Sequence, residues 1–100
     1  MDKNVIELVV FETKEDVAEE QFIQLFHKLN TILQSNISGF VKRSLTKDTA
    51  QNRWVEMIWW KSMQEAHAAL EKIPQLPDFQ QYCSAIKDDG TLMYHLEEKA

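Results

Sequence analysis

Three side chains in this sequence are of types that transfer protons in enzymes: His67, Tyr82 and Glu56. His67 follows Met63 by four residues and precedes Leu70 by three, so helical spacing places it on or beside an apolar stripe. A histidine that borders an apolar pocket can shuttle a proton near neutral pH. In the alternative interpretation, His67 is partly buried and hydrogen-bonded to backbone or water. The first question for the fold is therefore where His67 lies.

Two carboxylates and a tyrosine add to this candidate chemistry. Glu7 and Glu56 each interrupt an apolar, strand-like segment, where a carboxylate acts as a general base or pairs with a cation at an interface. Alternation along the strand places Glu56 on the same face as Trp60, so Glu56 is the better catalytic candidate of the two. Tyr82 lies on the apolar side of a helical segment, where its hydroxyl donates to a substrate oxygen or reaches water. The cations that could pair with the carboxylates are Lys42, Arg43, Arg53 and Lys61.

The hydrophobic pattern predicts the elements that must position these side chains. Residues 5–12 are apolar on both faces and predict a strand that is covered on both sides. Residues 17–34 predict an amphipathic helix with acidic side chains around its first turn. Strands are predicted at residues 40–45, at the tryptophan-rich residues 53–61 and at residues 92–97.

A broken helical region separates the last two strands. Ser62 and Glu65 fit a capping box, which predicts that a helix starts there. Pro74 and Pro77 stop that helix, and Asp78 is placed to cap a second short helical segment. The predicted order is therefore β-α-β-β-α-β.

This order is typical of the ferredoxin-like split β-α-β arrangement, an α+β fold. In it, both helices cover one face of a four-stranded antiparallel sheet. The chain has 100 residues, so we expect a single domain over residues 1–100. Its strands carry apolar side chains on both faces, and a chain of this length has no third layer for the second face. We therefore expect a homodimer in which two open sheet faces cover each other.

Composition excludes several classes of protein. The net charge is −5 and the basic residues are dispersed, which disfavours nucleic-acid binding. No apolar run approaches the roughly 18 residues of a membrane helix, so no membrane association is expected. The N-terminal residues 1–4 lack the order of a signal peptide, and the lone Cys83 cannot form an intramolecular disulfide. The expected location is the cytoplasm.

Cofactor motifs are also missing from the sequence. No H-x-x-x-H or C-x-x-C spacing predicts a metal site. Gly39 and Gly90 are isolated, so they form neither a phosphate-binding loop nor a dinucleotide fingerprint. We expect neither a metal nor an organic cofactor.

Several short features nevertheless resemble a known family. They are the strand-to-helix junction at residues 60–62, the small residues Ala66 and Ala69, and the segment at residues 77–82 that follows a proline. Together with the order of elements, they resemble the dimeric α/β-barrel superfamily and, within it, antibiotic biosynthesis monooxygenase-like domains. That superfamily includes cofactor-independent oxygenases of aromatic polyketides, haem-degrading monooxygenases, lactone isomerases and proteins with no assigned reaction.

The resemblance also implies which residues surround a pocket. Haem-degrading members have an Asn on the first strand, a Trp at the end of the third and a His in the second helical region. Here Trp60 matches, but Leu8 and Cys83 occupy the other two positions, so haem degradation is not expected. The residues that the resemblance places around a pocket are Trp60, Leu8, Phe79 and Cys83.

Two functional hypotheses from different classes follow. In the first, a homodimeric α/β barrel binds a small apolar or aromatic molecule and oxygenates it without metal or flavin, with His67 or Tyr82 handling a proton. In the second, the chain is a non-catalytic ligand-binding or interaction module. Isomerisation of a lactone is a third, weaker hypothesis. A ligand-sized cavity beside Trp60 and His67 favours the first hypothesis, and a filled core favours the second.

Overall fold

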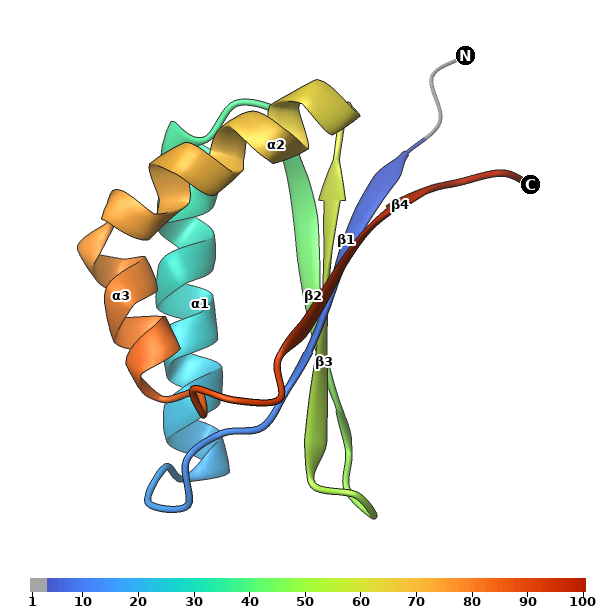
Figure 1. The fold of residues 1–100 in the computed structure, drawn as a ribbon. Helices are drawn as coiled ribbons and strands as arrows, with labels where there is room; N and C mark the ends of the chain where they lie inside the picture. Colours follow the sequence, from blue (N-terminus) through green and yellow to red (C-terminus); the bar gives the residue numbers. More distant parts are fainter. Residues whose placement is uncertain (1–3) are drawn as a thin grey trace.

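The computed structural model describes residues 4–100; residues 1–3 of the N-terminal segment considered above lie outside the described residues. The elements are β1 (Val5–Phe11), α1 (Glu19–Asn36), β2 (Phe40–Asp48), β3 (Arg53–Trp60), α2 (Met63–Lys72), the 3-10 helix η1 (Ile73–Gln75), α3 (Pro77–Ser84) and β4 (Leu92–Glu97). Figure 1 shows two layers, with the three α-helices together on one side of the sheet. Among the residues described, no helix has the length and hydropathy to cross a bilayer.

The four strands form one antiparallel sheet in the order β2-β3-β1-β4. The apolar strands β1 and β3 are central, and the more polar β2 and β4 form the edges. The predicted α+β, ferredoxin-like fold is therefore confirmed. Its second helical region is divided into α2, η1 and α3, as the two prolines predict.

The predicted boundaries of β2 and α1 are wrong: β2 ends three residues later, and α1 is shifted by two residues at both ends. β2 extends to Asp48, which pairs with Arg53, and does not end near residue 45. Polar residues suit this end of β2 because an edge strand has one side free of neighbouring strands. α1 begins at Glu19 rather than near residue 17, and Asp16 precedes the helix instead of lying in its first turn.

Ser62 caps the start of α2 as predicted, while the Glu65 carboxylate accepts a hydrogen bond from the Ser62 hydroxyl at 3.2 Å rather than from its backbone N–H. The Glu65 backbone N–H donates to Ser62 Oγ at 3.1 Å. The Glu65 carboxylate also accepts a hydrogen bond from Ser38 Oγ at 2.8 Å, which ties α2 to the turn before β2. This turn requires Gly39, which has φ of 84° and whose added Cβ would lie 2.6 Å from Glu65 atoms.

The predicted role of Asp78 as a helix cap is wrong. The N-cap of α3 is Leu76, because Pro77 occupies the first helical position, where its missing N–H costs no hydrogen bond. Asp78 therefore lies inside the first turn, where its charge suits the helix dipole, and its Oδ1 is 3.5 Å from Lys28 Nζ. Pro74 lies in η1, so the prolines break the helical region as predicted.

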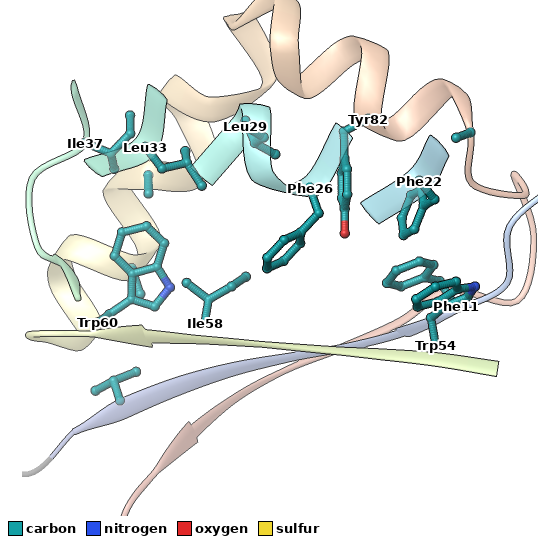
Figure 2. Close-up of a cluster of buried hydrophobic side chains, with 14 residues drawn as sticks. Phe11, Phe22, Phe26, Leu29, Leu33, Ile37, Trp54, Ile58, Trp60 and Tyr82 are labelled. Atoms are coloured by element: carbon teal, nitrogen blue, oxygen red, sulfur yellow. The ribbon is translucent and has the colours of Figure 1, made fainter. Parts of the chain in front are cut away.

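The core lies between the helices and one face of the sheet, and Figure 2 shows its aromatic side chains converging there. Phe22 of α1 stacks on Tyr82 of α3, with ring centroids 4.8 Å apart, and meets Trp54 of β3 at 5.1 Å. Trp60, at the other end of β3, is fully buried. The large aromatic side chains of the core thus join α1 and α3 to the sheet, whereas α2 buries only the small side chains of Ala66 and Ala69.

The opposite face of the sheet carries no helix of the described chain (Figure 1). Its side chains are apolar on β1, β3 and β4, and polar on β2, where Lys42, Ser44 and Thr46 pair with Trp59, Met57 and Val55. Its side chains alternate with the buried ones, as the predicted two-faced strands require. On β4, Leu92, Tyr94 and Leu96 are 47%, 49% and 42% exposed. The central strands contribute Ile6, Leu8, Val10, Val55, Met57 and Trp59 to this face, which we call the open face.

Candidate active site

A cavity of about 310 Å³ lies between the helices and the sheet. Its wall is mostly apolar, with side chains from all four strands, from α1, α2, η1 and α3, and from the loop before β4. The apolar side chains include Leu29, Leu33, Ile58, Trp60, Ile73, Phe79 and Ile86. This volume is at the lower end of the range for small-molecule sites. The cavity is therefore suited to a compact apolar molecule.

A buried ion pair forms part of the cavity wall. Glu56 is 5% exposed, and its Oε2 accepts a hydrogen bond from Arg43 Nε at 2.7 Å. Its Oε1 accepts one from the Tyr82 hydroxyl at 3.0 Å. Both oxygens of Glu56 are therefore occupied, and its charge is compensated inside the protein.

Arg43 is held from three directions and still has a free donor. Its Nη1 donates to the Phe26 carbonyl at 3.0 Å, and its guanidinium lies 3.9 Å from the centre of the Phe26 ring. Its buried Nη2 has no hydrogen-bond partner among residues 4–100. Trp60 Nε1 is likewise buried without a partner in that range. Two cavity residues thus carry N–H groups that an acceptor on a ligand could satisfy.

Tyr82 and Cys83 both lie in this environment, and both are kept protonated. Burial, together with the charge of Glu56, raises the pKa of Tyr82 well above its usual value. Burial and Glu56 also raise the pKa of Cys83 to about 11. Tyr82 is therefore a hydrogen-bond donor that positions Glu56, and Cys83 is a poor nucleophile.

Glu7 is the second carboxylate of the cavity, and its surroundings differ from those of Glu56. It is 7% exposed, and its Oε1 lies 3.1 Å from His95 Nε2 on β4. Burial raises the pKa of Glu7, His95 lowers it, and the charge of Glu56 raises it further. The nearby Trp60 N–H has the smallest effect and lowers the pKa of Glu7, although Trp60 Nε1 makes no hydrogen bond. Glu7 is therefore the cavity carboxylate better suited to take up a proton.

The structure does not place His67 in the cavity wall. The buried residues of α2 are Ala66 and Ala69, and His67 is turned about 100° from Ala66 around the helix axis. It is exposed, and its ring meets the His95 ring edge-to-face with 5.2 Å between centroids. The expectation that His67 borders the pocket is corrected accordingly.

Of the other predicted site residues, five line the cavity and one, Leu8, does not. Glu56, Trp60, Phe79, Tyr82 and Cys83 all line the cavity. Leu8 does not, because it follows Glu7 and therefore projects from the opposite face of β1, where it pairs with Met57 and Tyr94. The expectation for Leu8 came from the family resemblance and is wrong.

Sequence reasoning named Arg43 as one of four cations that could pair with the carboxylates, but it missed His95 as a site residue. Arg43 interrupts the apolar alternation of its strand, which is a signal for a buried cation. His95 carries no such signal, because its contact with Glu7 joins residues 88 positions apart. Within residues 4–100, no group of three or more His, Cys, Asp or Glu side chains could hold a metal ion.

Comparison with known proteins relates this geometry to a wider group. No protein-family model and no curated protein matches the sequence. A variant of SnoaB, a cofactor-independent oxygenase from Streptomyces nogalater, is similar in structure, with a TM-score of 0.76 and 16% identity over 98% of this chain and 95% of that chain. The monooxygenase from the gene ActVA-Orf6 of Streptomyces coelicolor, solved with nanaomycin D, has a TM-score of 0.74 and 13% identity over 99% and 90%.

A dimeric ferredoxin-like protein of unknown function from Jannaschia sp. is also similar, with a TM-score of 0.65 and 15% identity over 95% of this chain and 99% of that chain. Several further similar structures are provisionally described as antibiotic biosynthesis monooxygenases. At such identities the likeness concerns the fold. The chain has the fold of antibiotic biosynthesis monooxygenase-like proteins, and at this level the resemblance seen in the sequence is confirmed.

Proposed function

We propose that this protein binds a small apolar or aromatic molecule in its cavity and oxygenates it without a metal or an organic cofactor. The observation that carries the proposal is an apolar cavity of about 310 Å³ with two buried carboxylates in its wall. The shared fold with a cofactor-independent oxygenase supports the choice of reaction.

Such a reaction requires a base and a substrate that supplies its own electrons. A CH₂ group made acidic by a neighbouring carbonyl and aromatic rings loses a proton, and the resulting carbanion reduces O₂. One oxygen atom becomes a carbonyl on the substrate and the other leaves as water, so that R₂CH₂ and O₂ give R₂CO and H₂O. The protein then has to bind the molecule, remove a proton and exclude water.

Glu7 is our proposed base. Glu56 is unsuited because Arg43 and Tyr82 occupy both of its oxygens. The contact of Glu7 with His95 uses only Oε1, and burial raises the pKa of Glu7 toward the range useful at neutral pH. In this proposal Tyr82 positions Glu56, and His67 does not touch the substrate.

The two unpaired donors of the cavity are proposed to bind the oxygen of the substrate. As a proton leaves the carbon, negative charge develops on the neighbouring carbonyl oxygen. N–H groups that are already fixed in a buried site stabilise such charge without reorganising. Trp60 Nε1 and Arg43 Nη2 are the described donors in the cavity wall that lack a partner.

We also propose that the protein acts as a homodimer in the cytoplasm. The open face is the surface that a second copy would cover, and its β4 side chains Leu92, Tyr94 and Leu96 are all more than 40% exposed. A structure with the same fold is described as dimeric. A cytoplasmic location agrees with the single Cys83, which stays reduced there.

The test uses 1,8-dihydroxyanthrone, a three-ring molecule with an acidic CH₂ group, in a buffer that contains EDTA. We expect oxygen uptake above the rate without protein, and at least a tenfold slower rate in Glu7→Gln. Glu20→Gln, an exposed acid of α1, is the matched control and should behave like the wild type. Tight binding without oxygen uptake would refute the oxygenase and favour the non-catalytic ligand-binding module. Absence of binding to this and related aromatic molecules would refute the pocket.

A further inference from the structure

Three titratable side chains lead from the cavity to the surface beside β4. Glu7 lines the cavity, and its Oε1 contacts His95 Nε2 at 3.1 Å. The His95 side chain is 16% exposed, so it reaches both Glu7 and solvent. The exposed His67 of α2 packs against it, with ring centroids 5.2 Å apart. Neither histidine belongs to the cavity wall, so both would remain accessible when the cavity is filled.

We propose that His95 is the proton outlet of Glu7 and that His67 is a positioning residue for the His95 ring. The inference rests on the proposed function, in which Glu7 removes a proton from a molecule in the cavity. That molecule separates Glu7 from water on the cavity side, so a second route lets Glu7 return to its carboxylate form before O₂ has reacted. One proton is taken up again from water when the peroxide anion formed with O₂ loses its outer oxygen as water, so the whole reaction releases no net proton. His95 provides this route because it contacts Glu7 from outside the cavity wall.

The transfer balances without any oxidant or reductant. A C–H bond of the substrate breaks, its electron pair stays on the substrate, and the proton goes to the Glu7 carboxylate. Neutral His95, protonated on Nδ1, accepts this proton at Nε2 and becomes an imidazolium, which releases its Nδ1 proton to water. Proton exchange with water then moves the remaining ring proton from Nε2 back to Nδ1. Glu7 is then again a carboxylate and His95 again neutral.

The charges around Glu7 suit a carboxylate that first takes up a proton. Burial and the charge of Glu56 on β3 raise the pKa of Glu7, which favours uptake of a proton from the substrate, whereas His95 on β4 lowers this pKa, which favours its release again. Arg43 on β2 compensates Glu56, and His67 on α2 faces His95. Further charged groups on neighbouring elements are Glu97 of β4 and Lys87 and Asp88 of the loop beside the cavity.

The first experiment needs no ligand and follows the titration of Glu7 by NMR in protein with ¹³C-labelled glutamate. His95→Gln can still donate a hydrogen bond but cannot carry charge, so the pKa of Glu7 should rise by about one unit. His27→Gln, at an exposed position of α1, is the matched control and should leave Glu7 unchanged. An unchanged Glu7 titration in His95→Gln would overturn the proposed outlet.

The positioning role of His67 has its own comparison. His67→Ala removes the ring that packs on His95, so the titration of Glu7 should move toward that of His95→Gln. His67→Phe keeps a ring at this position and should restore the wild-type titration. A wild-type titration in His67→Ala would refute the positioning role, because the ring contact would then have no effect on His95.

Oxygen uptake with 1,8-dihydroxyanthrone separates the outlet from the proposed function. We expect His95→Gln to lose about tenfold or more of the rate and to regain part of it when imidazole is added. Normal turnover in His95→Gln would overturn the outlet and leave the proposed oxygenase standing. If the wild type shows no turnover, the oxygenase is refuted, and the NMR titration still decides whether His95 is coupled to Glu7.

Discussion

Replacing Arg43 by Met should destabilise the protein severely, because it leaves the charge of Glu56 buried without its partner. The side chains of the pair are 1% and 7% exposed, and the Nε–Oε2 distance is 2.7 Å. Removing one member of such a buried pair costs about 3 to 5 kcal/mol of unfolding free energy. The Phe26 carbonyl also loses its hydrogen bond from Nη1, so we expect the upper half of that range.

Urea unfolding at pH 7, followed by circular dichroism at equal protomer concentrations, measures this loss. For a domain of this size, a loss of about 4 kcal/mol lowers the Tm by about 15 to 30 °C. Lys28→Met is the matched control, because Lys28 pairs with Asp78 at 3.5 Å and its side chain is 58% exposed. It should change stability by less than about 1 kcal/mol.

A double variant distinguishes the unpaired charge from loss of packing. Arg43→Met combined with Glu56→Gln removes both charges, so we expect it to regain most of the stability that Arg43→Met loses. A loss below about 1 kcal/mol in Arg43→Met alone would refute the reasoning. Such a small loss would mean that water solvates the Glu56 carboxylate, and therefore that water reaches this part of the cavity wall.

Three further predictions concern other parts of the molecule. Burial raises the pKa of Glu7 above 4.5, so its contribution to stability is present below about pH 4.5 and is lost as the pH rises through the folded value; Glu7→Gln should abolish this decline in urea titrations across that window. Leu96→Lys places a charge on the open face and should convert a dimer into monomers in analytical ultracentrifugation; an undisturbed dimer would exclude this face as the interface. Gly39→Ala should cost about 2 kcal/mol in thermal unfolding, since φ is 84° and the new Cβ would lie 2.6 Å from Glu65; wild-type stability would show that α2 moves freely.

The fold could be predicted because its main determinants are local. Alternation along a strand was sufficient to place Glu56 and Trp60 on one face. The spacing of Ser62 and Glu65 predicted the start of α2, because a serine in this position can cap the backbone N–H of the third helical residue. The hydrogen bond from the Glu65 N–H to Ser62 Oγ confirms this reason. The end of β2 was missed because Asp48 is a polar residue on an edge strand, where pairing with one neighbour is enough.

The candidate site was less predictable because it depends on contacts between distant segments. Glu7 meets His95 only after β1 and β4 pair at the edge of the sheet. His67 was misplaced because a step of one residue, about 100° around the axis of α2, decides whether a side chain faces the cavity or solvent. Leu8 was misplaced for a different reason. The resemblance outweighed the alternation, which puts Leu8 and Glu7 on opposite faces.

Metal-free oxygenation is tested most directly by ¹⁸O₂ labelling during turnover of 1,8-dihydroxyanthrone by protein stripped of metal with EDTA. We expect each product molecule to gain one ¹⁸O atom and the other ¹⁸O atom to appear in water, and we expect Glu7→Gln to give only the background rate seen without protein. Product that gains its oxygen from H₂¹⁸O, or a rate that depends on added metal, would contradict metal-free oxygenation.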